Sequence, residues 1–552
     1  MSSSPDQLYH PTLKQSLRGK LTSSTLEFFN LKYARIPARY QDSILNDEPL
    51  KAGADGVVDS THFGPSCPQH RGAQAWDLTL VGSAKLNYAQ GQGPTESMDE
   101  FECLNLNVTL PNLGLDNDAT APGLLPVFVW VHGGGLSVGS NNWPQYQMRR
   151  FVERSAEIGK PIIGVGITYR VNIFGFLAGK EIGSRGNMGF KDQLQAFRWI
   201  KRHIAGFGGD PSNVTAVGES AGGISLSTLL CANVGDEGLF ERVALMSGEV
   251  TLRKWRNGWW QQKMLEDQST YLKLERRDTE SRRRALLDMD AEELAQKMPM
   301  FQQWTAAVDN EFFTARVTIE SVMDGKSNVH KPSWCKEIVI GDTGHDGTVL
   351  KGRVLDPPNA LGRLKQACAK YLTASETQRL LAAYKLERPL PKEQEAERLL
   401  DLVGDLRFHL AALSAYRGWK DASPPRRASR YHFHVPNPID GPFKGLSSHE
   451  LDVAYLFNNF EEHLDEHNKS VARAMQDRFI RWANGEGWVK EGKFVVFDGN
   501  GVTEVDEAHY DSIYRNGRGA ILGDIGLTKL WHVADVWQGV RQEDEELIKS
   551  KL

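Results

Sequence analysis

Two serines of this 552-residue chain lie in a G-x-S-x-G pattern, Ser137 in residues 135–139 and Ser220 in residues 218–222. The pattern is typical of a sharp turn between a strand and a helix that exposes a serine hydroxyl as a nucleophile. Three fixed positions also arise by chance in a chain with 52 glycines. The flanking residues must therefore decide between the two serines.

The residues around Ser220 fit such a turn. Residues 213–217, NVTAV, predict a short strand, and residues 221–234 begin with Ala-Gly-Gly and continue with helix-compatible apolar residues. Small residues at this place let the helix and strand backbones approach closely. Ser137 precedes NNWPQ at 141–145, a turn that contains a proline. We therefore predict that Ser220 is a nucleophile and that Ser137 is a loop residue.

The glycine run that follows His132 and a predicted buried strand at 126–131 has a second possible role in the same chemistry. Backbone without side chains can point N–H groups at the oxyanion that forms when a nucleophile attacks a carbonyl. A flexible turn is the alternative interpretation of these glycines. The position of the run upstream of Ser220, in the order found in such hydrolases, favours the oxyanion role.

A nucleophilic serine needs a base, and the base needs an acid that orients it. Residues 338–347, IVIGDTGHDG, predict an apolar strand that ends in a loop carrying Asp342 and Asp346. Residues 445–457 place His449 in a loop before an apolar helix. The order serine, acid, histidine is one of the known orders of such a triad, so both carboxylates are candidates.

The elements that must position these residues alternate along the chain. We predict strands in the ranges 24–37, 103–110, 126–131 and 161–169, and a helix over 192–204. Short apolar strands that alternate with helices indicate an α/β fold with a mostly parallel sheet. We expect a single domain over residues 1–552, with 251–335 as helical decoration. The charged run 275–284 can either bind a phosphate or form a solvated helix face, and its mixed signs favour the helix face.

Composition excludes several classes of protein. The hydrophobic share of 40% and charged share of 24% are ordinary for a soluble globular chain. A net charge of −5 and a pI near 6.3 give no reason to expect nucleic acid or an anionic membrane as partner. No apolar run approaches the ~20 residues of a transmembrane helix, and the N-terminus lacks the apolar core of a secretory signal. We expect a protein made in the cytosol with no transmembrane segment.

The sequence contains only weak patterns for a metal site or for disulfide bonds. The five cysteines are too scattered for a disulfide framework or a zinc site. His432 and His434, in YHFHV, can present an H-x-H pair on one strand face, but no acidic or cysteine partner is near them in sequence. We expect neither a metal nor another cofactor.

With these motifs in order, the chain resembles the type-B carboxylesterase family, which includes cholinesterases and fungal lipases. Its most specific match is GNMGFKDQLQAFRWIKRHIAGFGGDPSNVTAVGESAGG at 186–223. Further matching segments are 63–70, 99–108, 306–313, 341–347, 449–457 and 479–488. The resemblance implies an α/β-hydrolase fold across most of the chain.

The resemblance also implies roles for individual residues. Ser220 matches the nucleophile and His449 the general base. Asp346 matches the orienting acid, where the family usually has Glu, so its loop must sit closer to His449; Asp342 is the alternative. The implied oxyanion donors are the backbone amides of Gly134, Gly135 and Ala221. The implied supporting residues are Glu219 and Ser247, which can equally be ordinary buried polar residues.

Cys67 and Cys103 match a pair that forms a disulfide in secreted members of the family. Here we expect both to be reduced thiols.

The function that follows is hydrolysis of a carboxylic ester through an acyl-enzyme, without a cofactor, on a lipid-derived or secondary-metabolite substrate. A biosynthetic enzyme on the same scaffold, catalysing acyl transfer, lactone opening or dehydration, remains an alternative. A non-catalytic cholinesterase-like binding protein is a further one, disfavoured by the complete triad.

The sequence ends in Ser550, Lys551 and Leu552, which as a terminal tripeptide is a peroxisomal import signal read by a receptor. We expect residues 541–552 to form an exposed tail and the amphipathic segment 527–540 to dock by its Leu and Trp residues. The predicted location is therefore the peroxisome, and otherwise the cytoplasm.

Overall fold

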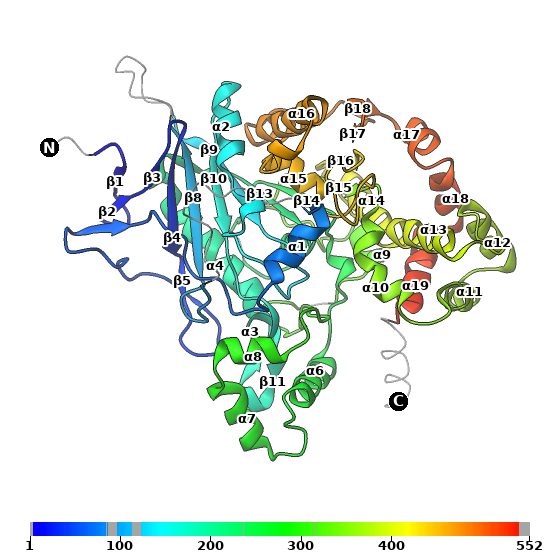
Figure 1. The fold of residues 1–552 in the computed structure, drawn as a ribbon, viewed down its shortest axis with the longest axis horizontal. Helices are drawn as coiled ribbons and strands as arrows, with labels where there is room; N and C mark the ends of the chain where they lie inside the picture. Colours follow the sequence, from blue (N-terminus) through cyan, green and yellow to red (C-terminus); the bar gives the residue numbers. More distant parts are fainter. Residues whose placement is uncertain are drawn as a thin grey trace.

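The computed structural model describes residues 4–83, 86, 97–112, 123–235, 237–314 and 316–539. At its centre lies an eleven-stranded sheet whose strands are, in spatial order, β18 (Gly501–Val505), β17 (Phe494–Asp498), β16 (Arg427–His434), β15 (Glu337–Thr343), β14 (Arg242–Met246), β13 (Gly209–Glu219), β9 (Leu125–Val131), β10 (Ile163–Ile167), β8 (Asn105–Pro111), β4 (Thr25–Lys32) and β3 (Lys20–Leu21). The strands from β17 to β10 are parallel, and both edges of the sheet are antiparallel. The predicted fold class, a mostly parallel sheet flanked by helices, is confirmed (Figure 1).

Helices cover both faces of this sheet (Figure 1). In chain order they are α1 (Ala73–Val81), α2 (Arg149–Glu157), α3 (Asn172–Phe176), α4 (Met188–His203), α5 (Ala221–Leu229), α6 (Gly258–Tyr271), α7 (Thr279–Asp288), α8 (Ala291–Lys297), α9 (Ile319–Met323), α10 (Lys351–Leu355), α11 (Ala360–Tyr371), α12 (Ala374–Ala383), α13 (Lys392–Gly404), α14 (Leu410–Lys420), α15 (Leu451–Phe457), α16 (Glu466–Ala483), α17 (Glu507–Tyr514), α18 (Arg518–Ile525) and α19 (Leu527–Trp537). Smaller sheets join β1 (Gln7–His10), β2 (Gln15–Arg18) and β7 (Val57–Asp59), β5 (Ala34–Arg35) with β6 (Ile44–Leu45), and β11 (Ala178–Gly179) with β12 (Ser184–Arg185). None of the described helices is both long and apolar enough to cross a bilayer.

Strand β9 shows how the sheet separates two cores. Its residues Val127, Val129 and Val131 belong to the core packed by α4 and α5, whereas Phe128 and Trp130 belong to the core packed by α2, α15 and α16. All five side chains are fully buried. Strands covered on both faces read as continuous apolar runs because successive side chains point to opposite faces. This is why the PVFVWV segment predicts a central strand.

The turn from β13 into α5 brings backbone segments into close contact. Ser220 lies between the two elements with φ 50° and ψ −119°, a conformation that side-chain-bearing residues rarely adopt. A Cβ atom on Gly222 would lie 2.0 Å from the carbonyl oxygen of Val131, and one on Gly248 would lie 2.1 Å from that of Ser220. Both glycines are therefore required by close backbone approach.

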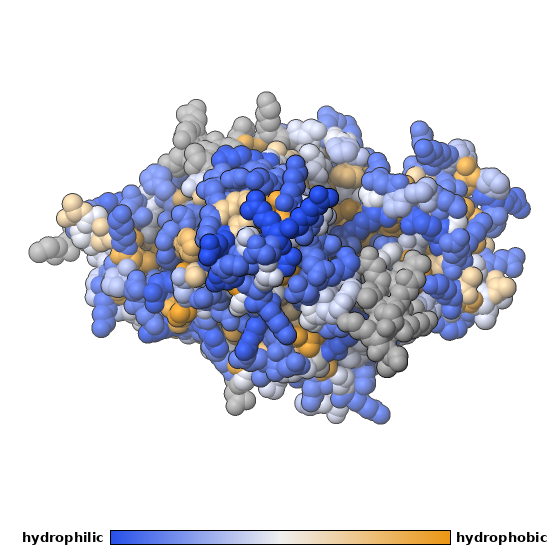
Figure 2. Space-filling model, turned by 90° about the horizontal axis from the view of Figure 1, so that it is seen from below, coloured by the Kyte–Doolittle hydropathy of each residue, from blue (hydrophilic) through white to orange (hydrophobic). Residues whose placement is uncertain are grey.

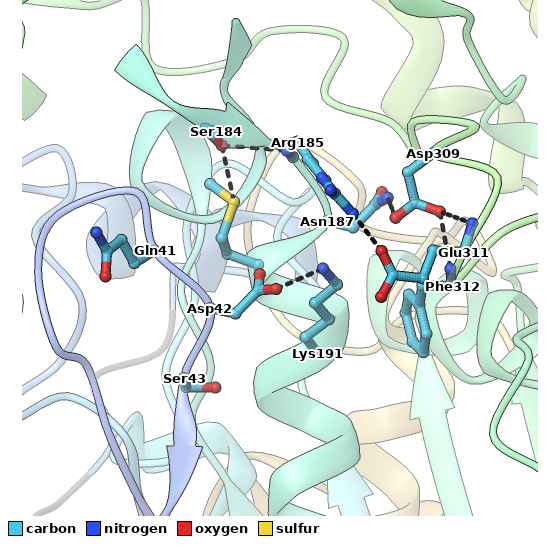
Figure 3. Close-up of polar contacts among 12 residues, drawn as sticks. Gln41, Asp42, Ser43, Ser184, Arg185, Asn187, Lys191, Asp309, Glu311 and Phe312 are labelled. Carbon is cyan, nitrogen blue, oxygen red and sulfur yellow. Dashed lines mark hydrogen bonds and ion pairs between the residues drawn. The ribbon is translucent and has the colours of Figure 1, made fainter. Parts of the chain in front are cut away.

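The loop that follows α8 is hydrogen-bonded to Asn187, the residue that precedes α4. Asn187 donates from Nδ2 to the carbonyl of Ala307 and accepts from the amide of the same residue, both at 2.8 Å. Asp309 accepts hydrogen bonds from Asn187 and from the amides of Glu311 and Phe312 (Figure 3). It also accepts one from the amide of Phe313. These contacts anchor the loop that follows α8 against the sheet-covering helix α4.

Helices α6, α7 and α8 project from this segment at the bottom of Figure 1. The face seen from below is mainly hydrophilic (Figure 2). In α7 only Leu286 is buried, and Arg284 pairs with Glu280 at 3.0 Å. The charged run 275–284 thus includes a solvated helix face with internal ion pairs.

The last described helix, α19, packs by its apolar side. Leu527, Leu530, Val533 and Trp537 join a core with α11, α12 and α13. This agrees with the docking expected for the amphipathic segment. The expected tail at 541–552 lies outside the described residues.

The close approach at Gly222 generates a stability prediction. Gly222→Ala should lower the free energy of unfolding by about 1–3 kcal/mol, because the added methyl collides with backbone that cannot swing away. Urea unfolding followed by circular dichroism measures the change. Gly258→Ala is the matched control, since a Cβ there meets nothing within 4 Å. An equal effect of the two substitutions would contradict the packing argument.

Candidate active site

Ser220 lies at the carboxyl end of β13 and lines a cavity of about 500 Å³. The turn is held in place because the amide of Ser220 donates to the carbonyl of Met246 at 2.8 Å. Ser137 is different, since it is 2% exposed, its hydroxyl accepts from the amide of Gln302 at 3.3 Å, and it is absent from the described lining of the cavity. The structure therefore presents Ser220, and not Ser137, to a ligand.

His449 lines the same cavity and contacts the predicted acid. Its Nδ1 lies 2.6 Å from Oδ1 of Asp346, and both side chains are buried. Oδ2 of Asp346 accepts from the hydroxyl of Ser247 at 2.9 Å and from the amide of Thr343 at 2.8 Å. A carboxylate at Nδ1 favours the tautomer with the proton on Nδ1, which leaves Nε2 as the basic atom.

The alternative acid, Asp342, lies elsewhere. Its carboxylate accepts from Nδ1 of His409 at 2.9 Å and from Nδ1 of His432. Burial opposes the charged form, but the two imidazoles hold the pKa of Asp342 well below its usual range. Asp342 belongs to a separate buried group behind β15 and β16.

That group is also the strongest metal-like cluster among the described residues. Donor atoms of Asp342, His409 and His432 all lie within 4.8 Å of one another. His434, the second histidine of the H-x-H pair, is not part of this cluster, and its Nε2 lies 3.0 Å from the hydroxyl of Tyr510. The Nδ1 atoms of His409 and His432 are hydrogen-bonded to the carboxylate, whereas Nε2 of His432 is buried and has no hydrogen-bond partner in the described part of the chain.

The loops that carry acid and base are joined directly. The amide of His345 donates to the carbonyl of Ser447 at 2.9 Å, and the amide of Ser447 donates back to Nδ1 of His345 at 3.1 Å. His345 and Ser448 also form a short parallel bridge. This contact brings the residue before Asp346 against the residue before His449. The shorter Asp side chain can therefore reach the imidazole.

Nε2 of His449 lies beside Glu219, and both residues line the cavity. Glu219 Oε1 lies 3.1 Å from it, yet Nε2 makes no hydrogen bond with a described residue. Burial and the carboxyl groups of Glu450, Asp452, Asp346 and Asp77 raise the pKa of Glu219 well above its usual value. A raised pKa favours the neutral form of Glu219, so the buried group beside Nε2 does not add a full negative charge there.

Further acids behind His449 were not found from the sequence. Tyr146 donates its hydroxyl to Asp77 at 3.0 Å and to Glu450, and Gln145 donates to Asp77 at 2.8 Å. Burial raises the pKa of Asp77 to about 6. Asp77 precedes the base by more than 370 positions, so no local pattern connects them.

The glycine run lies opposite Ser220. Gly134 and Gly135 have φ of 95° and 64°, and a Cβ on Gly134 would meet the carbonyl oxygen of Val138 at 2.2 Å. The imidazole of His132 stacks on Tyr169 at 4.4 Å and supports the loop. No described residue accepts a hydrogen bond from the amides of Gly134, Gly135 or Ala221, the first residue of α5. These three N–H groups are available to an oxyanion.

The remaining walls of the cavity are partly apolar. Trp76 and Phe301, with ring centroids 4.3 Å apart, both line it. The apolar lining includes Trp76, Leu80, Ile224, Leu252, Phe301, Val349, Leu350 and Phe408. Trp255 packs on Phe313 and Trp260 on Arg256, and neither belongs to the described lining. Those tryptophans stabilise the core.

Cys67 and Cys103 are buried as free thiols. Contact with the Cys67 thiol, together with burial, raises the pKa of Cys103 well above its usual value. Their redox state in the cell stays a prediction.

Comparison with known proteins assigns the chain to a family. Residues 17–491 match the Carboxylesterase family. The chain belongs to the carboxylesterase family. Lipase 3 of Yarrowia lipolytica is 28% identical over 486 residues, covering 87% of this chain and 89% of the lipase. Phenmedipham hydrolase of Pseudarthrobacter oxydans is 30% identical over 422 residues, covering 74% and 75%.

Solved structures agree on the fold. A carboxylesterase of Geobacillus stearothermophilus superposes with a TM-score of 0.68 at 24% identity, over 94% of this chain and 100% of that one. A PNB esterase superposes with a TM-score of 0.69 at 22% identity, over 93% and 99%. The expected family resemblance and the α/β-hydrolase fold are confirmed, and the protein is a carboxylesterase-type hydrolase.

The buried acids of this carboxylesterase make its stability depend on pH. Burial raises the pKa of Asp452 to about 7, although Tyr431 donates to it at 2.7 Å. Between about pH 4 and 7 the folded protein keeps a proton that the unfolded chain releases, so stability falls as pH rises.

We therefore expect Asp452→Asn to raise the free energy of unfolding relative to the parent by about 1–3 kcal/mol more at pH 8 than at pH 5. Urea titrations at the two pH values measure this difference. Asp440→Asn is the control, because Asp440 is exposed and Lys444 lowers its pKa. Equal stability changes at both pH values for Asp452→Asn would contradict the assignment.

Proposed function

We propose that this carboxylesterase hydrolyses its substrate through an acyl-enzyme on Ser220, with His449 as base and Asp346 as the orienting acid. The observation that carries the proposal is the 2.6 Å contact between His449 Nδ1 and Asp346 Oδ1 beside the cavity that Ser220 lines. A general base acts only when its tautomer and orientation are fixed, and this contact fixes both.

In the first step, Ser220 Oγ attacks the ester carbonyl while His449 Nε2 takes the hydroxyl proton. The carbonyl π electrons move to the oxygen, and the amides of Gly134, Gly135 and Ala221 stabilise the oxyanion. When the C–O bond breaks, His449 gives its proton to the departing alcohol. Water then attacks the acyl-enzyme by the same route and releases the acid and Ser220.

The walls of the cavity and the relatives of the chain bear on the substrate class. Several relatives are lipases, and the cavity offers apolar walls at Leu80, Leu252 and Phe301. We propose a lipid-derived or secondary-metabolite ester of moderate size as the natural substrate.

Replacement of the three residues tests the mechanism. Ser220→Ala and His449→Ala should abolish hydrolysis of short p-nitrophenyl esters, and Asp346→Asn should lower kcat by about 10⁴-fold because the imidazole adopts the wrong tautomer. Steady-state kinetics on folded protein, checked by circular dichroism, measures these losses. Asp342→Asn is the matched control and should keep kcat within about tenfold, since Asp342 contacts other histidines. Comparable losses in Asp342→Asn and Asp346→Asn would refute the assignment of the acid.

We also propose that the protein is imported into the peroxisome through Ser550, Lys551 and Leu552, which lie outside the described residues. A terminal tripeptide of this kind is recognised by the peroxisomal import receptor when it is accessible. An N-terminal fluorescent fusion should appear in puncta that coincide with a peroxisomal marker, and deletion of the three residues should make it diffuse. Puncta that persist after the deletion would show that the tripeptide is not the targeting signal.

A further inference from the structure

Three arginines from separate parts of the chain line the cavity that contains Ser220. Arg253 follows β14, Arg353 lies in α10, and Arg407 lies in a π-helical turn (Asp405–His409) between α13 and α14. Such π turns are frequent at functional sites. The mechanism proposed for Ser220 uses none of these arginines.

Of the three, Arg407 is the one with a carboxylate partner among the described residues. It pairs with Asp535 of α19 at 2.6 Å, donates to the carbonyl of Leu252 at 3.2 Å and lies 4.2 Å from the ring centroid of Trp531. These contacts fix the guanidinium at the cavity wall. Its charge is compensated within the protein.

Arg253 lacks such compensation. Its Nη2 donates to the carbonyl of Gly135 at 3.2 Å, but its Nη1 is buried and has no hydrogen-bond partner in the described part of the chain. Burial and the neighbouring charges of Arg353 and Arg407 lower the pKa of Arg253 to about 9. It still carries a proton at neutral pH. A buried cation with an unsatisfied donor is costly unless a ligand pairs with it.

Arg353 adds a second positive charge without an ion pair to any described residue. Burial and Arg407 lower its pKa as well. The cavity therefore has one wall of guanidinium groups, while the wall at His449 carries Asp77, Glu219 and Glu450. Burial and neighbouring carboxyl groups raise the pKa values of Glu219 and Glu450 well above their usual value, so the strong charge of the cavity lies on the arginine side. Such an arrangement orients a ligand that has an anionic end and a neutral reacting end.

We propose that Arg253 and Arg353, with Arg407, bind a carboxylate of the substrate, so that the hydrolysed ester carries a free carboxylate a few bonds from the scissile carbonyl. The planar fork of a guanidinium matches a carboxylate bidentately. A singly charged carboxylate suits this cavity better than a phosphate dianion, because three buried acids share it. This inference rests on the proposed ester hydrolysis and specifies its substrate.

The contact between Arg253 and Gly135 fixes where the carboxylate lies relative to the reaction. Gly135 supplies one of the amides proposed for the oxyanion, and its carbonyl holds the guanidinium. An ion pair at Arg253 would thus position the substrate next to the oxyanion loop. The arginines are positioning and specificity residues that contact the substrate away from the reacting atoms.

Paired esters test this assignment. On the acyl side, mono-p-nitrophenyl glutarate is compared with p-nitrophenyl pentanoate, and on the alcohol side meta-acetoxybenzoate with meta-tolyl acetate. We expect kcat/KM to favour the carboxylate ester at least tenfold in one pair. Arg253→Gln and Arg353→Gln should each lower this ratio by about 10- to 100-fold, mainly through KM.

Arg379→Gln is the matched control, because it also removes one positive charge but lies at the surface in an ion pair with Asp524. It should leave the ratio within twofold. Arg253→Lys keeps the charge without the fork and should give an intermediate ratio. Arg253→Gln removes a buried cation without an ion pair and loses one hydrogen bond, to the carbonyl of Gly135, so the variant should fold.

Binding of glutarate to the Ser220→Ala protein, measured by calorimetry, gives a readout independent of turnover. Arg253→Gln in that background should weaken binding at least tenfold. Hydrolysis of neutral esters without a carboxylate preference, or ratios unchanged by the arginine replacements, would overturn this inference and leave the proposed function standing. Glutarate binding that depends on Arg253, without hydrolysis of any ester, would support the carboxylate site and overturn the proposed function. Tighter binding of inorganic phosphate than of glutarate would reject a carboxylate as the ligand.

Discussion

The site depends on one close crossing of backbones. Strand β13 turns into α5 beside β9 so tightly that Gly222 touches the carbonyl of Val131 and Gly248 touches that of Ser220. No side chain fits at either place. This crossing forces Ser220 into its unusual backbone conformation and brings its hydroxyl to the edge of the sheet. The helix that begins at Ala221 presents its first N–H group at the same point. The histidine loop, the acid loop and the glycine run all converge on this fixed centre.

The cavity divides its charges between two walls. Beside His449, burial and the neighbouring carboxyl groups raise the pKa values of Glu219 and Glu450 well above their usual value, since ionising one acid raises the cost of ionising the next. The opposite wall carries guanidinium groups that retain their charge near neutral pH. The protein thereby separates a region of largely uncharged carboxyl groups around the base from a cationic region. The reacting carbonyl must lie between them, next to Gly135 and Ser220.

Much of this architecture was predictable where the signal is local. The apolar segment 126–131 predicts β9 because a strand covered on both faces needs no polar alternation. The small residues after Ser220 predict a tight strand-to-helix turn and distinguish it from Ser137. The choice between Asp346 and Asp342 was not local, because it depends on which loop contacts His345 and Ser447. The pairing of His432 with Asp342 joins residues 90 positions apart. The arginine wall unites three segments that share no pattern, and only tertiary packing brings them together.

The contact between His345 and Ser447 has a dynamic consequence. The two loops share one backbone hydrogen bond and one from the Ser447 amide to the His345 side chain, so they open together, because separating them exposes several donors and acceptors at once. The imidazole and its carboxylate therefore move as one rigid unit relative to Ser220, rather than as two independent side chains. Thermal motion at this place changes the approach of the pair to the serine and leaves the tautomer intact. Loss of the pair requires a cooperative local opening, so amides of both loops should exchange with solvent at a common rate.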